Sequence, residues 1–305
     1  MTADTNTKPD EAVGVGFIGL GKIGAPMARR LLGWPGGLTV HDVVAEATAP
    51  FGEAGARVAG TAAEVAEHAQ VISVMVRDDA QVAEVLSGEH GILSTAAPDT
   101  IVAVHSTVEA GTPARLAAEA AEHGVHVVDA PVSGGWMGAE QGTLAVMLGA
   151  PDDVAERLRG PFGCFASLVA AVGPVGAGTR AKLARNLITF VSYTAVGEAV
   201  RLAAASGVDL RLLGDVVRHS DQVTGGAGMV LLREQDSPLP LDDGLRPLFE
   251  HARDLGEKDL WLALELAAEV GVDLPMASHA LTALAPALGV PPDPLAGVFE
   301  PPEQP

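Results

Sequence analysis

Short runs of apolar residues punctuate the first half of the chain, and a helical pattern follows each of them. The runs are VGVGFI (13–18), LTVHD (38–42), VISVMV (71–76), IVAV (101–104) and VHVVD (125–129). Nearly every position in them is apolar, as in strands that are buried on both faces of a parallel sheet. Strands that alternate with helices in this way predict an α/β fold with a doubly wound parallel sheet.

A different pattern begins after about Pro174, where apolar residues recur with helical periodicity and no further strand is predicted. One helix of about eight turns should cover roughly 178–206. Further helices are expected near 209–219, 246–270 and 275–288.

These two patterns predict two domains. An α/β domain is expected over 13–174 and an all-helical domain over 175–294. The polar residues 1–12 are expected to form a disordered tail, and the Pro-rich residues 295–305 an extended one.

Two segments carry the Ser/Thr-x-x-Glu pattern with which side chains close the first turn of a helix. They are Thr61–Glu64 and Ser106–Glu109. In such a capping box the hydroxyl and the carboxylate each accept a hydrogen bond from a backbone N–H that the helix leaves unpaired. Both segments are therefore expected to begin helices.

The composition limits the classes of partner. Of the 305 residues 48% are hydrophobic and 19% charged, which is enough apolar material for a large core. The formal net charge at pH 7 is -20, and such a surface repels nucleic acid and anionic lipid. No nucleic-acid partner is expected, and an anionic substrate must be met by locally placed Lys or Arg side chains.

Several features that the sequence lacks bear on the compartment of the protein and on a metal site. Cys164 is the only cysteine, so no internal disulfide can form, as is typical of a reducing compartment. The polar start MTADTNTKPDE has no apolar core of a secretory signal. The most apolar long stretch, 183–205, carries Arg185, Asn186, Glu198 and Arg201, which argues against a membrane span. The 9 histidines show no ligand spacing. We expect a cytoplasmic protein without a membrane partner or a metal.

A glycine-rich turn follows the first apolar run. It reads Gly19-Leu20-Gly21-Lys22-Ile23-Gly24 and matches G-x-G-x-x-G, and a helix begins directly after it. In this motif the first glycine allows a tight turn, the second lets the backbone approach a pyrophosphate, and the third packs helix on strand. The strand, turn and helix together predict a Rossmann-type dinucleotide-binding domain.

Asp42 ends the second apolar run, eighteen residues beyond Gly24. A carboxylate at this place accepts hydrogen bonds from the ribose hydroxyls and repels a 2′-phosphate, which favours NAD over NADP. The following VVAEA offers no Lys or Arg that would reverse this preference. The alternative is that Asp42 only caps the next helix.

Several segments make the chain resemble the β-hydroxyacid dehydrogenase family, which includes 3-hydroxyisobutyrate dehydrogenase. They are GFIGLGKIGAPMARRLL (16–32), DAPVSGGWMGAEQGTLAVMLGA (129–150), GPVGAGTRAKLARN (173–186) and EKDLWLALELAAEVGVDLP (257–275). They occur in the order and spacing of the family. The resemblance implies a nicotinamide-dependent oxidoreductase that acts on a small 3-hydroxy acid.

By this resemblance, Lys182 is the acid/base group. A lysine can hold this role when burial, a neighbouring cation or a helix N-terminus lowers its pKa towards the working pH. Asn186 lies one helical turn further and is implied to hold the lysine or the substrate hydroxyl. The family commonly has two successive asparagines here, whereas this chain has Arg185-Asn186.

The resemblance also assigns the remaining site residues. Ser133, Gly134 and Gly135 form an anion cradle that is implied to hold the substrate carboxylate, and Ser133 is counted with the catalytic residues. Trp136 beside them is bulkier than many family members carry. The residues implied to line the cofactor site, besides the glycine-rich turn and Asp42, are Met75, Val76, Thr107 and Lys258.

Two other functions share this architecture. An imine reductase-like enzyme generally lacks a lysine at the position of Lys182, and a dinucleotide sensor without catalysis should have lost that lysine or the Ser-Gly-Gly cradle. Both features are present here. The family further implies a homodimer or tetramer that is formed through the helical domains.

Overall fold

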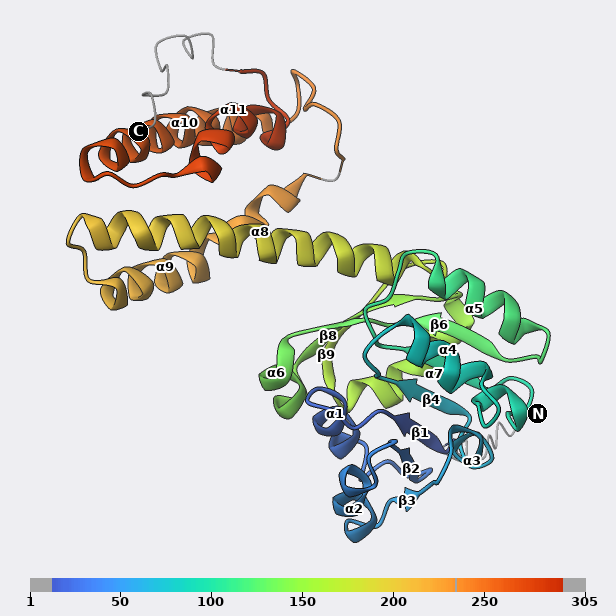
Figure 1. Ribbon diagram of the computed structural model, residues 1–305. Coiled ribbons are helices and arrows are strands. Elements are labelled where there is room, and N and C mark those ends of the chain that lie inside the picture. Colours follow the sequence, from blue (N-terminus) through green and yellow to red (C-terminus); the bar gives the residue numbers. More distant parts are fainter. Residues whose placement is uncertain (1–12, 234, 293–305) are drawn as a thin grey trace, which may run out of the picture. The chain divides into compact units, whose positions relative to one another are not determined.

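The computed structural model describes residues 13–233 and 235–292, and their contacts divide the chain into two compact units after Arg185 (Figure 1). The predicted boundary, after residue 174, precedes helix α8 (Ala177–Ala205), whereas the contacts divide the chain within this helix. The tails predicted at 1–12 and 295–305 lie outside the described residues.

The first unit is an α/β domain built on one sheet. Its strands are β1 (Val15–Ile18), β2 (Leu38–His41), β3 (Arg57–Val58), β4 (Val71–Val74), β5 (Ile101–Val104), β6 (His126–Asp129), β7 (Val132–Ser133), β8 (Leu144–Gly149) and β9 (Ala166–Gly173). Its helices are α1 (Gly24–Arg30), α2 (Ala45–Glu53), α3 (Ala62–Ala66), α4 (Asp79–Ser87), α5 (Thr112–Ala121), α6 (Gly135–Gln141) and α7 (Asp152–Gly163), with a short 3-10 turn, η1 (Ile92–Ser94).

The strand order β3-β2-β1-β4-β5-β6-β8-β7, with β9 beside β8, is that of a doubly wound sheet. The six strands from β3 to β6 are parallel, and β8 runs antiparallel to β6 and β7. The predicted fold class is therefore confirmed. Strands β3, β7, β8 and β9 were missed. Strands β3 and β7 have only two residues each, and β9 is rich in alanine, which is uncommon in strands.

Two apolar clusters lie on opposite faces of this sheet. Phe17 and Ile101 belong to the cluster that packs against α1, α2, α6 and α7. Ile18 and Val102, one residue further along the same strands, belong to the cluster under α3, α4 and α5. Successive side chains of a strand point to opposite faces, so both faces of each central strand must be apolar.

The second unit is helical. Besides the part of α8 from Asn186 onward it contains α9 (Leu210–Thr224), a 3-10 segment η2 (Gly226–Leu232), α10 (Arg246–Val270) and α11 (Pro275–Leu288). Among the described residues no strand follows Gly173, as predicted. The predicted bounds of the third and fourth helices agree with α10 and α11, whereas α9 runs on past residue 219 to a glycine with positive φ, Gly225.

A buried carboxylate ties two helices of the second unit together. Glu198 of α8 is only 5% exposed, and its two oxygens accept hydrogen bonds from the N–H groups of Met276 (2.8 Å) and Ala277 (3.0 Å). These groups belong to the first turn of α11, where the helix itself leaves N–H donors unpaired. The glutamate therefore caps a helix that is distant in the sequence.

Helix α8 is the one helix in the described part of the chain that is long and apolar enough to cross a membrane. Its best window has a mean hydropathy of 1.3 and only 6% of that window is buried. The length and composition of α8 therefore do not argue against a membrane span. The argument against one rests on its charged side chains, and one of them, Glu198, accepts a hydrogen bond within the protein.

The two predicted capping boxes behave differently. Thr61 accepts a hydrogen bond from the Glu64 N–H at the start of α3, as predicted. The prediction for Ser106 was wrong, because α5 begins only at Thr112. The Ser106 hydroxyl instead donates to the Val76 carbonyl (2.8 Å) and accepts from the Val76 N–H (3.0 Å), so it joins the ends of β4 and β5.

His105, the residue after β5, is fully buried among the rings of Phe17, Phe162 and Phe165. Its Nδ1 lies 2.7 Å from the Ala130 carbonyl oxygen, which can only accept, so Nδ1 carries the proton and Nε2 accepts from the Ser73 hydroxyl (3.0 Å). Burial lowers the pKa of His105 from 6.5 to about 4, against a smaller opposing effect of the Ala130 hydrogen bond. The imidazole is therefore neutral in the folded protein at neutral pH.

Replacing His105 with asparagine should remove a pH-dependent part of the free energy of unfolding. Between pH 6.5 and about 4 the unfolded chain binds a proton at this residue and the folded protein does not. Stability should fall over this range as the pH falls, by about 3 kcal/mol in total. Urea titrations at about pH 8 and about pH 4.5 should show a loss larger by about 2.5 kcal/mol in the unmodified protein than in His105→Asn. Equal losses would mean that His105 is protonated in the folded state.

Candidate functional site

The register of the central strands brings three loops to one edge of the sheet. Ile18 at the end of β1 pairs with His41 of β2 and with Val74 of β4. Gly19, Asp42 and Met75 therefore leave the sheet at the same level. This edge lies where the strand order reverses between β1 and β4, which is the place where doubly wound sheets bind ligands.

The three glycines of the turn have different surroundings. Gly19 has φ +95°, and a Cβ there would collide with the Met75 carbonyl oxygen. A Cβ on Gly24 would collide with the Gly19 carbonyl oxygen, whereas one on Gly21 would meet no atom within 4 Å. Gly19 and Gly24 are thus required by the fold, and Gly21 faces open space. This is the division of roles that a dinucleotide pyrophosphate needs.

Asp42 holds this turn in place. Its Oδ2 accepts a hydrogen bond from the Leu20 N–H (2.6 Å), and its Oδ1 accepts one from the Val44 N–H (2.8 Å). The first bond connects the carboxylate directly to the glycine-rich turn, so Asp42 does more than cap the next helix. Each carboxylate oxygen has a second lone pair for a ribose hydroxyl.

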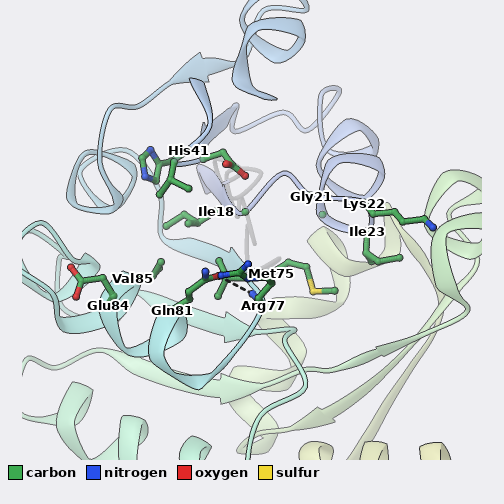
Figure 2. Close-up of a pocket in the computed structure, with 15 residues that line it drawn as sticks. Ile18, Gly21, Lys22, Ile23, His41, Met75, Arg77, Gln81, Glu84 and Val85 are labelled. Carbon is green, nitrogen blue, oxygen red and sulfur yellow. Dashed lines mark hydrogen bonds between the residues drawn. The ribbon is translucent and has the colours of Figure 1, made fainter. Parts of the chain in front are cut away.

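A cavity of about 530 Å³ opens over this edge (Figure 2). Most predicted cofactor residues line it, namely Gly19, Gly21, Lys22, Ile23, Gly24, Asp42, Met75 and Val76. Sequence reasoning missed the others, namely Ile18, His41, Val43, Arg77, Gln81, Glu84 and Val85. Figure 2 shows Gln81, Glu84 and Val85 on the side opposite Gly21 and Lys22. Their spacing on α4 places them on one helix face, a signal that was available in the sequence.

A second cavity of about 520 Å³ adjoins the first and shares His41, Asp42, Val43, Glu84 and Val85 with it. Together the two cavities are lined by residues from the loops after β1, β2, β3 and β4. The carboxylates of Asp42 and Glu84 stand where they meet. An open glycine, backbone N–H groups and paired carboxylates fit a dinucleotide held along this edge.

The Ser-Gly-Gly cradle lies at the end of β7. Ser133 is the last residue of that strand, and Gly134 and Gly135 have φ +126° and +63°, values that other residues rarely adopt. A Cβ on Gly134 would also press against Leu144 of β8 at 3.1 Å. Trp136 and Met137 follow at the start of α6, and both side chains are exposed.

Lys182 reaches this cradle from helix α8. Its Nζ donates a hydrogen bond to the carbonyl oxygen of Val132 (2.6 Å), the residue before Ser133. Burial lowers the pKa of Lys182, and the positive charge of Arg185, three residues further on the helix, lowers it as well. The predicted direction of this pKa shift is confirmed. Arg185, whose role the sequence did not indicate, contributes to it. The structure thus places the Lys182 amine at the backbone of the residue that precedes Ser133.

The other predicted residues are placed as follows. Thr107 is exposed just after β5, the neighbour of β4 in the sheet, and does not belong to the lining of the large cavity. Asn186 follows Lys182 by one turn of α8. Lys258 belongs to α10 in the second unit, where its Nζ pairs with Asp259 (2.8 Å). The roles of Thr107, Asn186 and Lys258 stay predictions. Among the described residues no group of three or more His, Cys, Asp or Glu side chains could hold a metal ion.

Alanine at Gly21 and at Gly24 should affect different properties of the protein. Gly24→Ala forces a Cβ against the Gly19 carbonyl and should lower the free energy of unfolding by about 1–3 kcal/mol. Gly21→Ala meets no protein atom, so it should change that free energy by less than about 0.5 kcal/mol. Its methyl group would occupy the place of the pyrophosphate, and the dissociation constant of NAD should rise at least about tenfold. Denaturant titration and calorimetric NAD binding measure both effects; unchanged NAD affinity in Gly21→Ala would place the pyrophosphate elsewhere.

Two family models match the chain, and they divide it between residues 173 and 176. Residues 14–173 match the NAD-binding domain of 6-phosphogluconate dehydrogenase. Residues 176–289 match the NAD-binding domain of NADP-dependent 3-hydroxyisobutyrate dehydrogenase.

Relatives cover nearly the whole chain. An uncharacterised oxidoreductase of Mycobacterium tuberculosis is 55% identical over 93% of this chain and 96% of its own length. The NAD-dependent L-serine dehydrogenase of Pseudomonas aeruginosa is 34% identical over 88% of this chain and 90% of its own length.

Solved structures show the same relationship. An oxidoreductase of Mycobacterium avium has a TM-score of 0.87 at 49% identity, over 92% of this chain and 99% of its own. The 3-hydroxyisobutyrate dehydrogenase of M. tuberculosis, solved with L-serine, has a TM-score of 0.63 at 30% identity, over 90% and 92% of the two chains. An imine reductase of Myxococcus stipitatus, 17% identical with a TM-score of 0.72 over 94% and 99% of the chains, shares the fold alone.

The geometry and the relatives agree on the nature of the site. The glycine-rich turn lies in a cavity that fits a dinucleotide, and the family models that match both units describe NAD-binding domains. The relatives are dehydrogenases that act on CH–OH groups. The chain belongs to the 3-hydroxyisobutyrate dehydrogenase family of NAD(P)-dependent β-hydroxyacid dehydrogenases.

Proposed function

We propose that the protein transfers a hydride between NAD and a small 3-hydroxy acid, with Lys182 as the acid/base group. One observation carries this proposal. An amine whose pKa is lowered by burial donates to the Val132 carbonyl, directly beside the Ser133-Gly134-Gly135 cradle. The proposed proton acceptor on α8 therefore contacts the residue that directly precedes the proposed anion cradle.

The chemistry follows from this neighbourhood. A dinucleotide held by the glycine-rich turn and Asp42 would supply the nicotinamide that exchanges a hydride with the alcohol or carbonyl carbon. Lys182 accepts the hydroxyl proton in the oxidation and donates it in the reduction, and its lowered pKa favours the neutral amine more than in an ordinary lysine. The hydrogen bond to Val132 orients the amine. We expect Asn186, one turn further on α8, to hold the substrate hydroxyl or the lysine.

The substrate class follows from the two functions that lie beside each other, the proposed anion cradle and the lysine amine. A carboxylate in the cradle and a hydroxyl at the lysine are the two ends of a short hydroxy acid. The L-serine dehydrogenase of P. aeruginosa and the L-serine complex of the M. tuberculosis 3-hydroxyisobutyrate dehydrogenase make L-serine and 3-hydroxyisobutyrate the first candidates. Next to them stand 3-hydroxypropionate, glycerate and 4-hydroxybutyrate.

A preference for NAD is supported by the carboxylates at the junction of the two cavities. Asp42 and Glu84 line both of them, and a 2′-phosphate placed there would be repelled. The cations of the larger cavity, Lys22 and Arg77, leave the sheet from the other two loops. They stand apart from the turn that follows β2.

We further propose a cytoplasmic homo-oligomer without nucleic-acid or membrane partners. Helices α8 and α9 expose large apolar side chains, among them Leu187 (65%), Phe190 (60%), Tyr193 (65%), Val216 (63%) and Val223 (79%). Such surfaces are typical of faces that a partner covers. Exposed Arg185 and Arg201 on α8 favour a protein partner over lipid. The net charge of -20 disfavours nucleic acid, and the single cysteine is typical of the cytoplasm.

The proposal is tested by reduced-nicotinamide formation with a panel of 3- and 4-hydroxy acids. Lys182→Ala should lower kcat by about a hundredfold or more, while the dissociation constant of NAD stays unchanged. In the oxidation, kcat/KM should rise with pH through a pKa below the ordinary lysine value, because the neutral amine is the base; in the reduction the dependence is reversed. Lys182→Arg keeps the charge but cannot lose its proton, so it should be equally inactive. Near-normal turnover of either variant at neutral pH would refute the assignment of Lys182.

The cofactor preference is tested by Asp42→Ser combined with Val43→Arg. Val43 is 93% exposed beside the cavity, so an arginine there has room to meet a 2′-phosphate. The ratio of kcat/KM for NADP to that for NAD should rise at least about tenfold, or about 1.4 kcal/mol. Val43→Arg alone is the control, and should change the ratio less because Asp42 still repels the phosphate. An unchanged ratio in the double variant would reduce Asp42 to its role of holding Leu20 and Val44.

A further inference from the structure

A buried carboxylate at the end of β6 is not used by the proposed chemistry. The side chain of Asp129 is fully buried. Its Oδ1 accepts a hydrogen bond from the Gly176 N–H and its Oδ2 accepts one from the Thr179 N–H, both at 2.6 Å. Burying a carboxylate away from water is costly unless hydrogen bonds satisfy it, and here both of its oxygens accept one.

Both donors belong to the start of helix α8. Gly176 precedes the first residue of the helix, and Thr179 lies in its first turn. The first N–H groups of a helix have no partner within it, and a carboxylate beside them is stabilised by the helix dipole. Gly176 has no side chain with which to cap the helix. The cap is supplied instead by Asp129, 47 residues earlier in the chain.

The same segment also binds Lys182. Three residues after Asp129, the Val132 carbonyl accepts the hydrogen bond from Lys182 Nζ (2.6 Å). Three residues after Thr179, Lys182 itself extends from α8. The segment that leads to the Ser133-Gly134-Gly135 cradle is therefore joined to α8 at two points, one at the helix start and one at the lysine amine.

Close backbone packing leaves the helix start little freedom. A Cβ on Gly178 would collide with the carbonyl oxygen of Met147 in β8, and a Cβ on Gly149 would collide with Oδ1 of Asp129. The first turn of α8 thus lies directly on the ends of β6 and β8. A change in the cap should move the start of α8 and with it Lys182, which lies in the next turn.

We propose that Asp129 is the positioning residue for the acid/base lysine, which it sets in register with the substrate cradle by holding the first turn of α8. This inference rests on the proposed role of Lys182. Asp129 does not lie in the lining of the cofactor cavity, so its effect should reach the reaction through the lysine and not through NAD.

Asp129→Asn has nearly the same shape but presents an NH₂ group to one of the two N–H donors. One hydrogen bond becomes a repulsive contact, and Lys182 should lose its contact with Val132. We expect kcat to fall about ten- to hundredfold, the usual consequence of a misplaced catalytic group. The dissociation constant of NAD should change less than about twofold, because the two sites do not share residues.

A double-mutant cycle separates positioning from mere stabilisation of the fold. In a Lys182→Ala background Asp129→Asn should have little further effect on kcat, because the group on which it acts is gone. The same fold-loss in both backgrounds would show that Asp129 acts independently of the lysine and would overturn the proposal.

A second measurement needs no substrate, so it stands even if the panel of hydroxy acids fails. The chain has lysines only at positions 8, 22, 182 and 258, so the ¹³C spectrum of the reductively methylated protein is simple. In Asp129→Asn the titration of Lys182, assigned with Lys182→Arg, should move up towards the ordinary lysine pKa as the amine leaves its half-buried place. An unmoved titration in a folded variant that binds NAD would overturn the proposal.

The matched control is Asp209→Asn. Asp209 also accepts hydrogen bonds from two helix N–H groups, those of Arg211 (2.8 Å) and Leu212 (3.0 Å), but at the start of α9. It should change neither kcat nor the Lys182 titration. If Asp129→Asn does not fold, Thr179→Pro removes one donor from the first turn of α8, where proline is tolerated. The same cycle and titration with this variant then decide the question.

Discussion

Parallel pairing of β1 with β2 and β4 is the constraint on which the nucleotide site depends. The register places Ile18 beside both His41 and Val74, so three loops leave the sheet at one level. The glycine-rich turn can then press against the Met75 carbonyl, while the Asp42 carboxylate reaches the Leu20 N–H from the next strand. A shift of one residue in either pairing would turn side chains to the other face and separate these partners.

Carboxylates that accept backbone N–H groups recur throughout the structure. Asp42 holds the glycine-rich turn, Asp129 the start of α8, and Glu198 the start of α11. In each case an acidic side chain accepts hydrogen bonds from backbone N–H groups, and at the starts of α8 and α11 the helix dipole also favours the negative charge. Part of the large acidic excess is therefore structural. Lys182 belongs to the few cations, and burial together with the positive charge of Arg185 lowers its pKa.

Much of this protein was predictable from its sequence. The five apolar runs contained β1, β2, β4, β5 and β6, because strands covered on both faces must be apolar throughout. The glycine-rich turn and Asp42 were recognised because the roles of these residues depend on their spacing along the chain. Helices α10 and α11 had the predicted bounds, since their ends carry strong local signals such as Pro275 and the glycines after each helix.

Contacts between distant segments were decided only by the tertiary structure. Ser106 has the sequence of a helix cap, but its hydroxyl finds the Val76 backbone in the neighbouring strand. Strands β8 and β9 pair with each other, although no local pattern in their apolar and Ala-rich residues indicates this pairing. Sequence determined the fold class and the candidate residues, because periodicity and motif spacing are local. Tertiary structure decided which carbonyl receives the Lys182 amine and which carboxylate begins its helix, because those partners lie about fifty residues away.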